Sequence, residues 1–157
     1  MKQITPCLWF EEEAEQAAKF YVSVFGGKSR ILQVTRYGDG QPGRKGSVLT
    51  VVFTLNGQKY VGLNGGPHDA FNDAVSFYIE CKTQKEIDQY WRKLSKGGKE
   101  IQCGWLRDRY GVRWQVVPAN IHRLIDAKHP ERAARVMQAV RGMVKLDVAQ
   151  LERAYRG

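Results

Sequence analysis

Apolar and polar residues follow the same order twice along the first three quarters of the chain. In the first half, a short apolar run over 4–10 indicates a strand. Glu11, Glu12 and Glu13 favour a helix N-terminus, apolar residues at helical spacing follow over 14–25, and Gly26-Gly27 ends that helix. Three further segments have strand patterns, over 30–37, 48–55 and 58–63. Asn56-Gly57, between the last two, is typical of a two-residue hairpin turn.

The second half repeats this order. A strand pattern over 74–81 precedes Thr83-Gln84-Lys85-Glu86, which has the spacing of a capping box at a helix start. Gly97-Gly98 ends that helix, and strands are predicted over 100–106 and 112–117. Each half therefore predicts a strand, a helix and then two or three strands, which indicates an α+β fold with a largely antiparallel sheet.

The last quarter has a different pattern. Helical spacing appears over 120–127, Pro130 can begin a second helix, and Asp147 can cap a third. We therefore expect a domain over 1–118 and a helical tail over 119–157, packed on that domain or on a partner subunit.

Composition narrows the class of protein. A chain of 157 residues with 43% hydrophobic residues can bury a core, and one domain with a small appendage is the default. No apolar run approaches the ~20 residues of a membrane span, and the N-terminus lacks a signal-peptide pattern. Three well-separated cysteines, Cys7, Cys81 and Cys103, are typical of reduced thiols. We expect a cytoplasmic protein without a membrane partner.

The net charge of +9 comes entirely from the residues after Trp91. A basic second half could contact nucleic acid or an anionic ligand. It could also be a solvated basic surface, which the scattered positions and the lack of a nucleic-acid motif favour. A nucleic-acid partner is therefore only an alternative.

Several blocks match a known family together. They are Pro6-Cys7-Leu8-Trp9-Phe10, Ala17-Ala18-Lys19-Phe20-Tyr21, Leu63-Asn64-Gly65-Gly66-Pro67, Gln102-Cys103-Gly104-Trp105-Leu106, 108–115 and 135–139. With the repeated order of elements, the chain resembles the glyoxalase/bleomycin resistance/extradiol dioxygenase (vicinal oxygen chelate) superfamily. More narrowly, it resembles the PhnB-like family, whose members often carry the label 3-demethylubiquinone-9 3-methyltransferase.

This resemblance implies two βαβββ modules that form a cup-shaped, mixed, mainly antiparallel eight-strand sheet, followed here by C-terminal helices. It also implies a homodimer. Metal enzymes of the superfamily hold a divalent ion in the cup, with one ligand from each of four strands.

The positions that match those ligands carry no suitable side chain. They are Thr5 or Pro6, Gly62 or Asn64, Ser76, and Gln115. Uncharged groups such as these leave the charge of a metal uncompensated, so we expect neither a metal nor another cofactor. The methyltransferase label also lacks support, because no Gly-rich turn follows a strand in a βα pattern.

The same positions remain candidates for ligand contact. Asn64, Gln115 and Ser76 could offer hydrogen bonds to a neutral polar molecule, or could be structural groups bonded to the backbone. Alternation places Trp114 opposite Gln115, in the core.

Two tryptophans and an arginine complete the candidate set. Trp9 and Trp105 could line an apolar pocket or belong to the core. Arg109, in the turn after Asp108, could contact an anionic ligand or be a surface residue. The leading hypothesis is metal-independent binding of a small molecule in the sheet cavity. An isomerase or lyase with an atypical site is a second possibility, and catalysis stays open.

Overall fold

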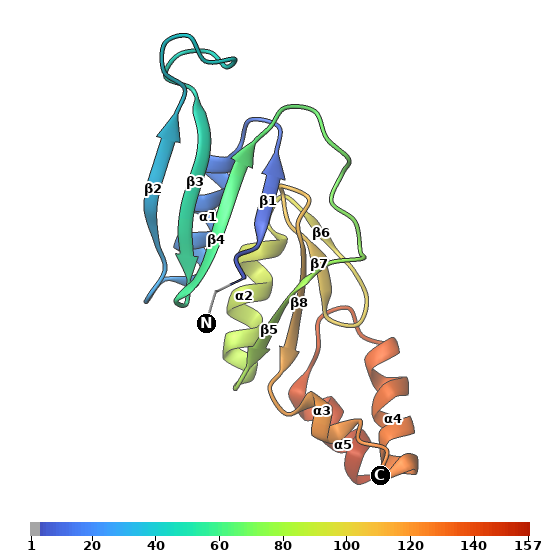
Figure 1. Cartoon of the computed structure of the whole chain (residues 1–157). Coiled ribbons are helices and arrows are strands. Elements are labelled where there is room, and N and C mark those ends of the chain that lie inside the picture. The colour runs from blue at the N-terminus through green and yellow to red at the C-terminus, as the bar shows by residue number, and fades with distance from the viewer. Residues whose placement is uncertain (1–3) are drawn as a thin grey trace. The chain divides into compact units, whose positions relative to one another are not determined.

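Each half of the chain folds its own four-stranded sheet with one helix on one face. The computed structural model describes residues 4–157, which divide into two units, one ending at Ala70 and the other spanning Phe71–Gly157. Each unit contains one βαβββ module, and each sheet has one parallel and two antiparallel strand pairs (Figure 1). The predicted α+β class and the duplicated order of elements are confirmed.

The first unit has the sheet order β1-β4-β3-β2, with β1 parallel to β4. Its elements are β1 (Cys7–Phe10), α1 (Ala14–Phe25), β2 (Arg30–Arg36), β3 (Val48–Leu55) and β4 (Gln58–Asn64). The predicted hairpin is confirmed: Asn56 and Gly57 have φ of 48° and 88°, and Leu55 pairs with Gln58. Two successive positive φ angles are what a type I′ turn requires, and Asn-Gly supplies them at little cost.

Side-chain packing explains why α1 lies against this sheet. Its small residues Ala17 and Ala18 and its aromatic Tyr21 are fully buried, as is Phe53 of β3. The rings of Tyr21 and Phe53 stack with centroids 6.3 Å apart. A helix with one apolar face and a strand with alternating apolar residues thereby share one core.

The second unit repeats the arrangement with the sheet order β5-β8-β7-β6 and β5 parallel to β8. Its elements are β5 (Phe77–Cys81), α2 (Gln84–Ser95), β6 (Lys99–Glu100), β7 (Trp105–Arg107) and β8 (Arg113–Pro118). The predicted capping box is confirmed, because Glu86 N donates to Thr83 Oγ1 over 3.2 Å and Thr83 N donates to Glu86 Oε2 over 3.3 Å.

The prediction of a single strand over 100–106 is wrong. Two short strands, β6 and β7, pair there as an antiparallel hairpin. Between them Cys103 and Gly104 have positive φ angles of 63° and 81°, which a strand cannot contain. Their amides donate to the carbonyl oxygens of Met143 and Val144 over 2.8 and 2.9 Å. The turn thus bonds to a distant segment, and the second module has all three strands after its helix.

The predicted C-terminal helices are α3 (Ile121–Leu124), α4 (Pro130–Arg141) and α5 (Val148–Arg156). They share one buried cluster with Val117 of β8, formed by Ile121, Leu124, Val136, Leu146 and Leu151. The helices therefore pack on the second module, whereas the division of the chain into domains at residue 118 stays a prediction. None of the helices within residues 4–157 is both long and apolar enough to span a bilayer.

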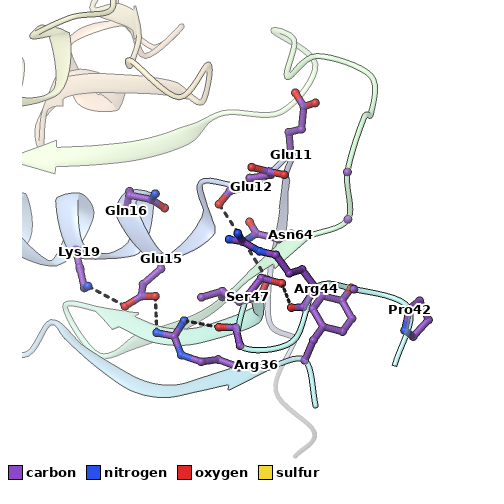
Figure 2. A pocket seen from close by; sticks show the side chains of 16 residues that line it. Glu11, Glu12, Glu15, Gln16, Lys19, Arg36, Pro42, Arg44, Ser47 and Asn64 are labelled. Atoms are coloured by element: carbon purple, nitrogen blue, oxygen red, sulfur yellow. Dashed lines mark hydrogen bonds and ion pairs between the residues drawn. The ribbon is translucent and has the colours of Figure 1, made fainter. Parts of the chain in front are cut away.

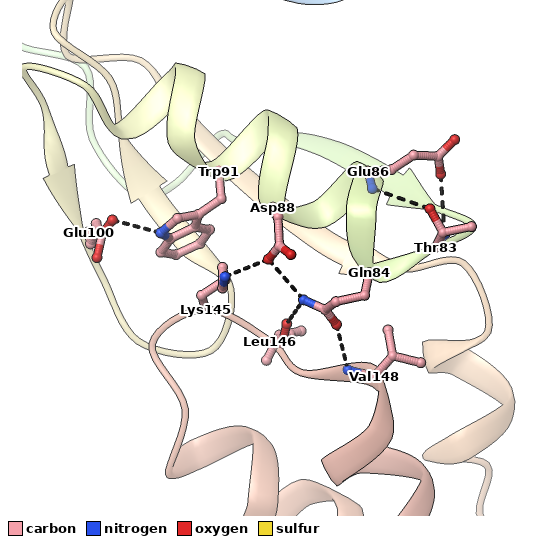
Figure 3. Close-up of polar contacts among 9 residues, drawn as sticks. All are labelled: Thr83, Gln84, Glu86, Asp88, Trp91, Glu100, Lys145, Leu146 and Val148. Atoms are coloured by element: carbon pink, nitrogen blue, oxygen red, sulfur yellow. Dashed lines mark hydrogen bonds and ion pairs between the residues drawn. The ribbon is translucent and has the colours of Figure 1, made fainter.

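Residues 143–148, here named the strap, connect α4 to α5 along this module. Gln84 of α2 binds the strap at two points: its Nε2 donates to Leu146 O over 3.2 Å and its Oε1 accepts from Val148 N over 2.8 Å (Figure 3). Lys145 forms an ion pair with Asp88, one turn further along α2. The strap is thus bonded to α2 and to the turn before β7.

Candidate functional site

The second sheet has one face covered by α2 and one face that α2 leaves open. Trp114 is 2% exposed on the covered face, as the alternation of β8 predicts. Gln115 lies on the open face, directly opposite Tyr78 of β5 and Trp105 of β7 in the strand register. Because directly opposite residues on neighbouring strands project to the same side, Tyr78, Gln115 and Trp105 form one row across the sheet.

Gln115 is also joined to Ser76. Its Nε2 donates to Ser76 Oγ over 2.9 Å, and both side chains are half-buried at the open face. Within residues 4–157, Gln115 Oε1 has no hydrogen-bond partner. The pair therefore presents an amide oxygen that can accept and a hydroxyl that can donate, which suits a neutral polar group.

Tyr78 closes one end of the row. Its ring stacks on His122 with centroids 5.8 Å apart, and its hydroxyl lies 3.4 Å from His122 Nε2. Burial, with a smaller contribution from the Glu80 charge, raises the pKa of Tyr78. The hydroxyl consequently stays protonated near neutral pH and acts as a neutral hydrogen-bonding group.

A second row on the same face lies two residues further along the strands, and its side chains are cationic. Lys99 of β6 pairs with Arg107 of β7, and Arg107 pairs with Arg113 of β8. All three line a hollow of about 470 Å³, together with Asp73, Glu100, Ile101, Gln102 and Val144. The guanidinium of Arg113 is held by an ion pair with Asp73 and by a bond of 2.7 Å to Gly111 O.

In the first unit, β1 and β4 present Cys7, Trp9, Val61 and Leu63 to the face away from α1. Trp9 is 45% exposed in this unit, so its alternative interpretation as a core residue is corrected. Its indole N–H donates to Gly66 O over 3.1 Å. Trp9 thus belongs to the open face of the first sheet.

Asn64 lies on the opposite face of β4, and its side chain forms hydrogen bonds with backbone groups. Its Oδ1 accepts from Ala14 N over 2.8 Å at the start of α1, and its Nδ2 donates to the carbonyls of Glu12 and Val48. Gly62 shares this face, since a Cβ there would lie 3.3 Å from Ala14 Cβ. A metal-ligating side chain from the fourth strand would have to lie on the open face of β4, where this chain has Val61 and Leu63.

A hollow of about 960 Å³ lies beside Asn64, lined by the start of α1 and the loop 37–47. Figure 2 shows the side chains that line it. Glu15 bonds both Lys19 and Arg36 over 2.8 Å, and Arg36 also donates to Gly46 O over 3.2 Å. The hydrogen bond from Lys19, then that from Arg36, lowers the pKa of Glu15. These charges satisfy one another and hold the loop beside α1.

Arg109 has a structural contact. Its Nε and Nη2 donate to Lys96 O over 3.2 and 3.0 Å, where α2 ends. Satisfying a carbonyl at a helix C-terminus is a common use of arginine. A contact of Arg109 with an anionic ligand stays a prediction. To bind such a ligand with the same nitrogens, Arg109 would have to break its hydrogen bonds to Lys96 O.

The donor groups do not suit a divalent metal. Of the four positions matched to family ligands, Ser76 and Gln115 meet on the open face of the second sheet. Gly62 and Asn64, the alternatives for the fourth strand, face α1, and Thr5 and Pro6, the alternatives for the first strand, precede β1. Within residues 4–157, no three His, Cys, Asp or Glu side chains are grouped as metal ligands would be. Neutral oxygens alone give little affinity for such an ion.

Strand register brings in residues that the sequence analysis did not select. Tyr78 and Lys99 lie on the open face because they pair with Gln115 and Arg107. The alternation within 74–81 could have placed Tyr78 beside Ser76. Lys99 could not be placed, because β6 has only two residues and its pairing depends on the turn at Gly104.

Comparisons with known proteins agree with this architecture. The profile of the family described as 3-demethylubiquinone-9 3-methyltransferase matches residues 2–117. A PhnB protein from Bacillus cereus, described as a candidate 3-demethylubiquinone-9 3-methyltransferase, is 37% identical with a TM-score of 0.69, over 75% of this chain and 100% of its own. Curated proteins yield no match.

Two more distant structures share the fold. A protein from Pseudomonas aeruginosa is 19% identical with a TM-score of 0.62, over 73% of this chain and 95% of its own. The fosfomycin resistance protein FosX from Mesorhizobium loti is 13% identical with a TM-score of 0.51, over 72% of this chain and 87% of its own. The chain thus belongs to the 3-demethylubiquinone-9 3-methyltransferase (PhnB-like) family.

Proposed function

We propose that this protein binds a small organic molecule on the open face of its second sheet, without a metal. The observation that carries the proposal is the Gln115–Ser76 hydrogen bond, which leaves an acceptor and a donor between two aromatic side chains. Aromatic walls with a few fixed polar groups are typical of ligand sites. The expected ligand has a flat apolar body and a neutral polar group that bonds Gln115.

The elements of the two modules do not favour methyl transfer, although the family carries that description. The βαβββ modules have no strand–Gly-rich turn–helix unit of the kind that holds a nucleotide-like cofactor.

We also propose that the protein is a homodimer. The open face of the first sheet exposes Trp9 beside Leu63, and exposed apolar rows are common at subunit contacts. Light scattering after gel filtration would measure its mass, and a monomer at micromolar concentration would contradict the dimer.

Nuclear magnetic resonance offers a direct test of the binding proposal. A library of fragment-sized aromatic amides and phenols is titrated into uniformly ¹⁵N-labelled protein. Hits are expected to shift the Trp105 indole and Gln115 side-chain amide resonances. Gln115→Leu should weaken the same hits by about tenfold, because it leaves the ligand's polar group unbonded. Gln89→Leu, on the exposed surface of α2, is the control and should leave them unchanged. Hits that ignore both reporters, or no hits, would refute the proposal.

A further inference from the structure

The cationic row on the second sheet departs from what sheet stability favours. Lys99, Arg107 and Arg113 lie directly opposite one another on three neighbouring strands. Like charges in that relation destabilise a sheet. Residues that lower the stability of a fold without a compensating structural contact are commonly found at functional sites.

The surrounding acidic groups neutralise only part of the row. Glu100 also lines the hollow, but its carboxylate is engaged with α2, since its Oε1 accepts from Trp91 Nε1 over 2.7 Å (Figure 3). Asp73 pairs with Arg113, but its side chain is 71% exposed, whereas that of Arg113 is 13% exposed. Within residues 4–157, Lys99 and Arg107 have no ion-pair partner. Two exposed cations, Lys99 and Arg107, are thus available at the hollow, beside the ion-paired guanidinium of Arg113.

The strap supplies the remaining wall of the hollow. Val144, 43% exposed, lines it, and the bond from Gly104 N to Val144 O holds that residue beside β7. The family profile ends at Val117, so this wall belongs to the part of the chain beyond the profile. The hollow therefore combines cations with an apolar surface that the tail provides.

We propose that this hollow binds the acidic group of the ligand, and that the ligand is an organic acid, carboxylate or phosphate, with an aromatic body. This inference rests on the proposed function and specifies its ligand class. Guanidinium groups bind carboxylate and phosphate through paired hydrogen bonds. Arg113 and Gln115 are two residues apart on β8, a spacing of about 7 Å along a strand. The acidic group and the neutral polar group are therefore separated by roughly the length of a para-substituted benzene ring.

Matched probes can separate this inference from the proposed function. Terephthalamate carries a carboxylate and an amide at opposite ends of a benzene ring, and terephthalamide replaces the carboxylate with a second amide. The phosphate arm uses 4-carbamoylphenyl phosphate. Titration calorimetry of the whole protein should give tighter binding of at least one acid than of terephthalamide, by about fivefold or more. That difference should shrink as salt is added.

Variants assign the difference to the cationic row. Arg107→Gln and Lys99→Gln should each weaken the acids by about two- to fivefold and leave terephthalamide unchanged, since each removes one exposed charge. Lys85→Gln removes the same charge from α2, which covers the other face of the sheet, and should have no effect. Circular dichroism checks that all variants are folded.

The outcomes are distinguishable. Equal binding of acids and terephthalamide, or equal losses in Lys85→Gln and Arg107→Gln, would refute the acid-binding hollow and leave the proposed function intact. If no probe binds at millimolar concentration, the inferred ligand class is wrong, and the fragment titration decides the proposed function separately. Tighter binding of terephthalamate would indicate a carboxylate ligand, and tighter binding of 4-carbamoylphenyl phosphate would indicate a phosphate ligand.

Discussion

Asp108 shows how one buried carboxylate organises the turn between β7 and β8. It is 1% exposed, and its Oδ1 accepts from the amides of Tyr110 and Val112 over 2.8 and 3.1 Å. Its Oδ2 accepts from Trp114 Nε1 over 2.8 Å. A buried acid is tolerated because donors from both the turn and the core surround it.

Asp108→Ala is expected to lower the free energy of unfolding by about 2–4 kcal/mol, because it strands buried donors that the carboxylate now satisfies. Urea unfolding followed by tryptophan fluorescence would measure the change. Asp39→Ala is the control: that aspartate is on the surface with Lys45, and its loss should cost within about 0.5 kcal/mol. Similar losses for the two variants would contradict the role of Asp108.

Cys81 gives the stability a dependence on alkaline pH. The thiol is 2% exposed, and burial, with a smaller contribution from Glu86, raises its pKa from 9.0 to about 12. A pKa that is higher in the folded protein contributes stability that is complete below pH 9 and is lost as pH rises toward 12.

We therefore expect the free energy of unfolding to fall between pH 9 and 11 by up to about 1 kcal/mol per pH unit more in the wild type than in Cys81→Ala. Urea titrations across this range would measure the two slopes, with Cys103→Gly, at a partly exposed cysteine whose positive φ suits glycine, as the matched control. Parallel slopes for wild type and Cys81→Ala would show that the buried thiol does not contribute.

At the residue scale, the sequence predicted which face of a strand a residue occupies better than it predicted the residue's hydrogen-bond partners. Alternation correctly separated Trp114 from Gln115, because it depends only on the geometry of one strand. It could not reveal that Asn64 caps α1, since that bond joins residues fifty positions apart. Arg109 likewise looked available in the sequence, but it bonds the end of α2.

At the scale of elements, the strap is the connection that sequence patterns do not contain. It has no helix or strand periodicity of its own. Its backbone bonds the Gln84 side chain and the turn at Gly104, and its Lys145 forms an ion pair with Asp88. The hairpin at Asn56-Gly57 and the capping box at Thr83 were predictable because all their determinants are local. The division of 100–106 into two strands was not, because its cause lies forty residues later in the chain.

Gln84→Ala should release the strap from α2. The variant removes the bonds to Leu146 and Val148, and we expect a loss of about 1–2 kcal/mol. Hydrogen exchange should become faster at the Val148 amide, whose acceptor is gone, while Gln89→Ala on the exposed surface of α2 should change neither quantity. Unchanged exchange at Val148 would mean that other contacts hold the strap.

At the scale of the whole molecule, the two units share a topology but differ in the surfaces they present. The open face of the first sheet is apolar around Trp9 and Leu63, whereas that of the second carries Gln115, Ser76 and the cationic row. The second unit alone carries the helical tail. Duplication of the module is therefore visible in the sequence, but the division of roles between its two copies appears only when register assigns residues to faces.

This difference between the two open faces bears on whether ligand binding depends on a metal ion. Among the residues described at the positions compared with family ligands, the second module offers Ser76 and Gln115, and the open face of β4 in the first offers Val61 and Leu63. None of these four side chains is charged. We expect dialysis against a chelator to leave both the thermal midpoint and terephthalamate affinity unchanged, because neither depends on an ion. Adding Zn²⁺, Ni²⁺ or Mn²⁺ back should likewise raise neither. Elemental analysis of the dialysed protein supplies the independent measurement: a stoichiometric ion that survives dialysis, with affinity lost on its forced removal, would contradict metal-independent binding.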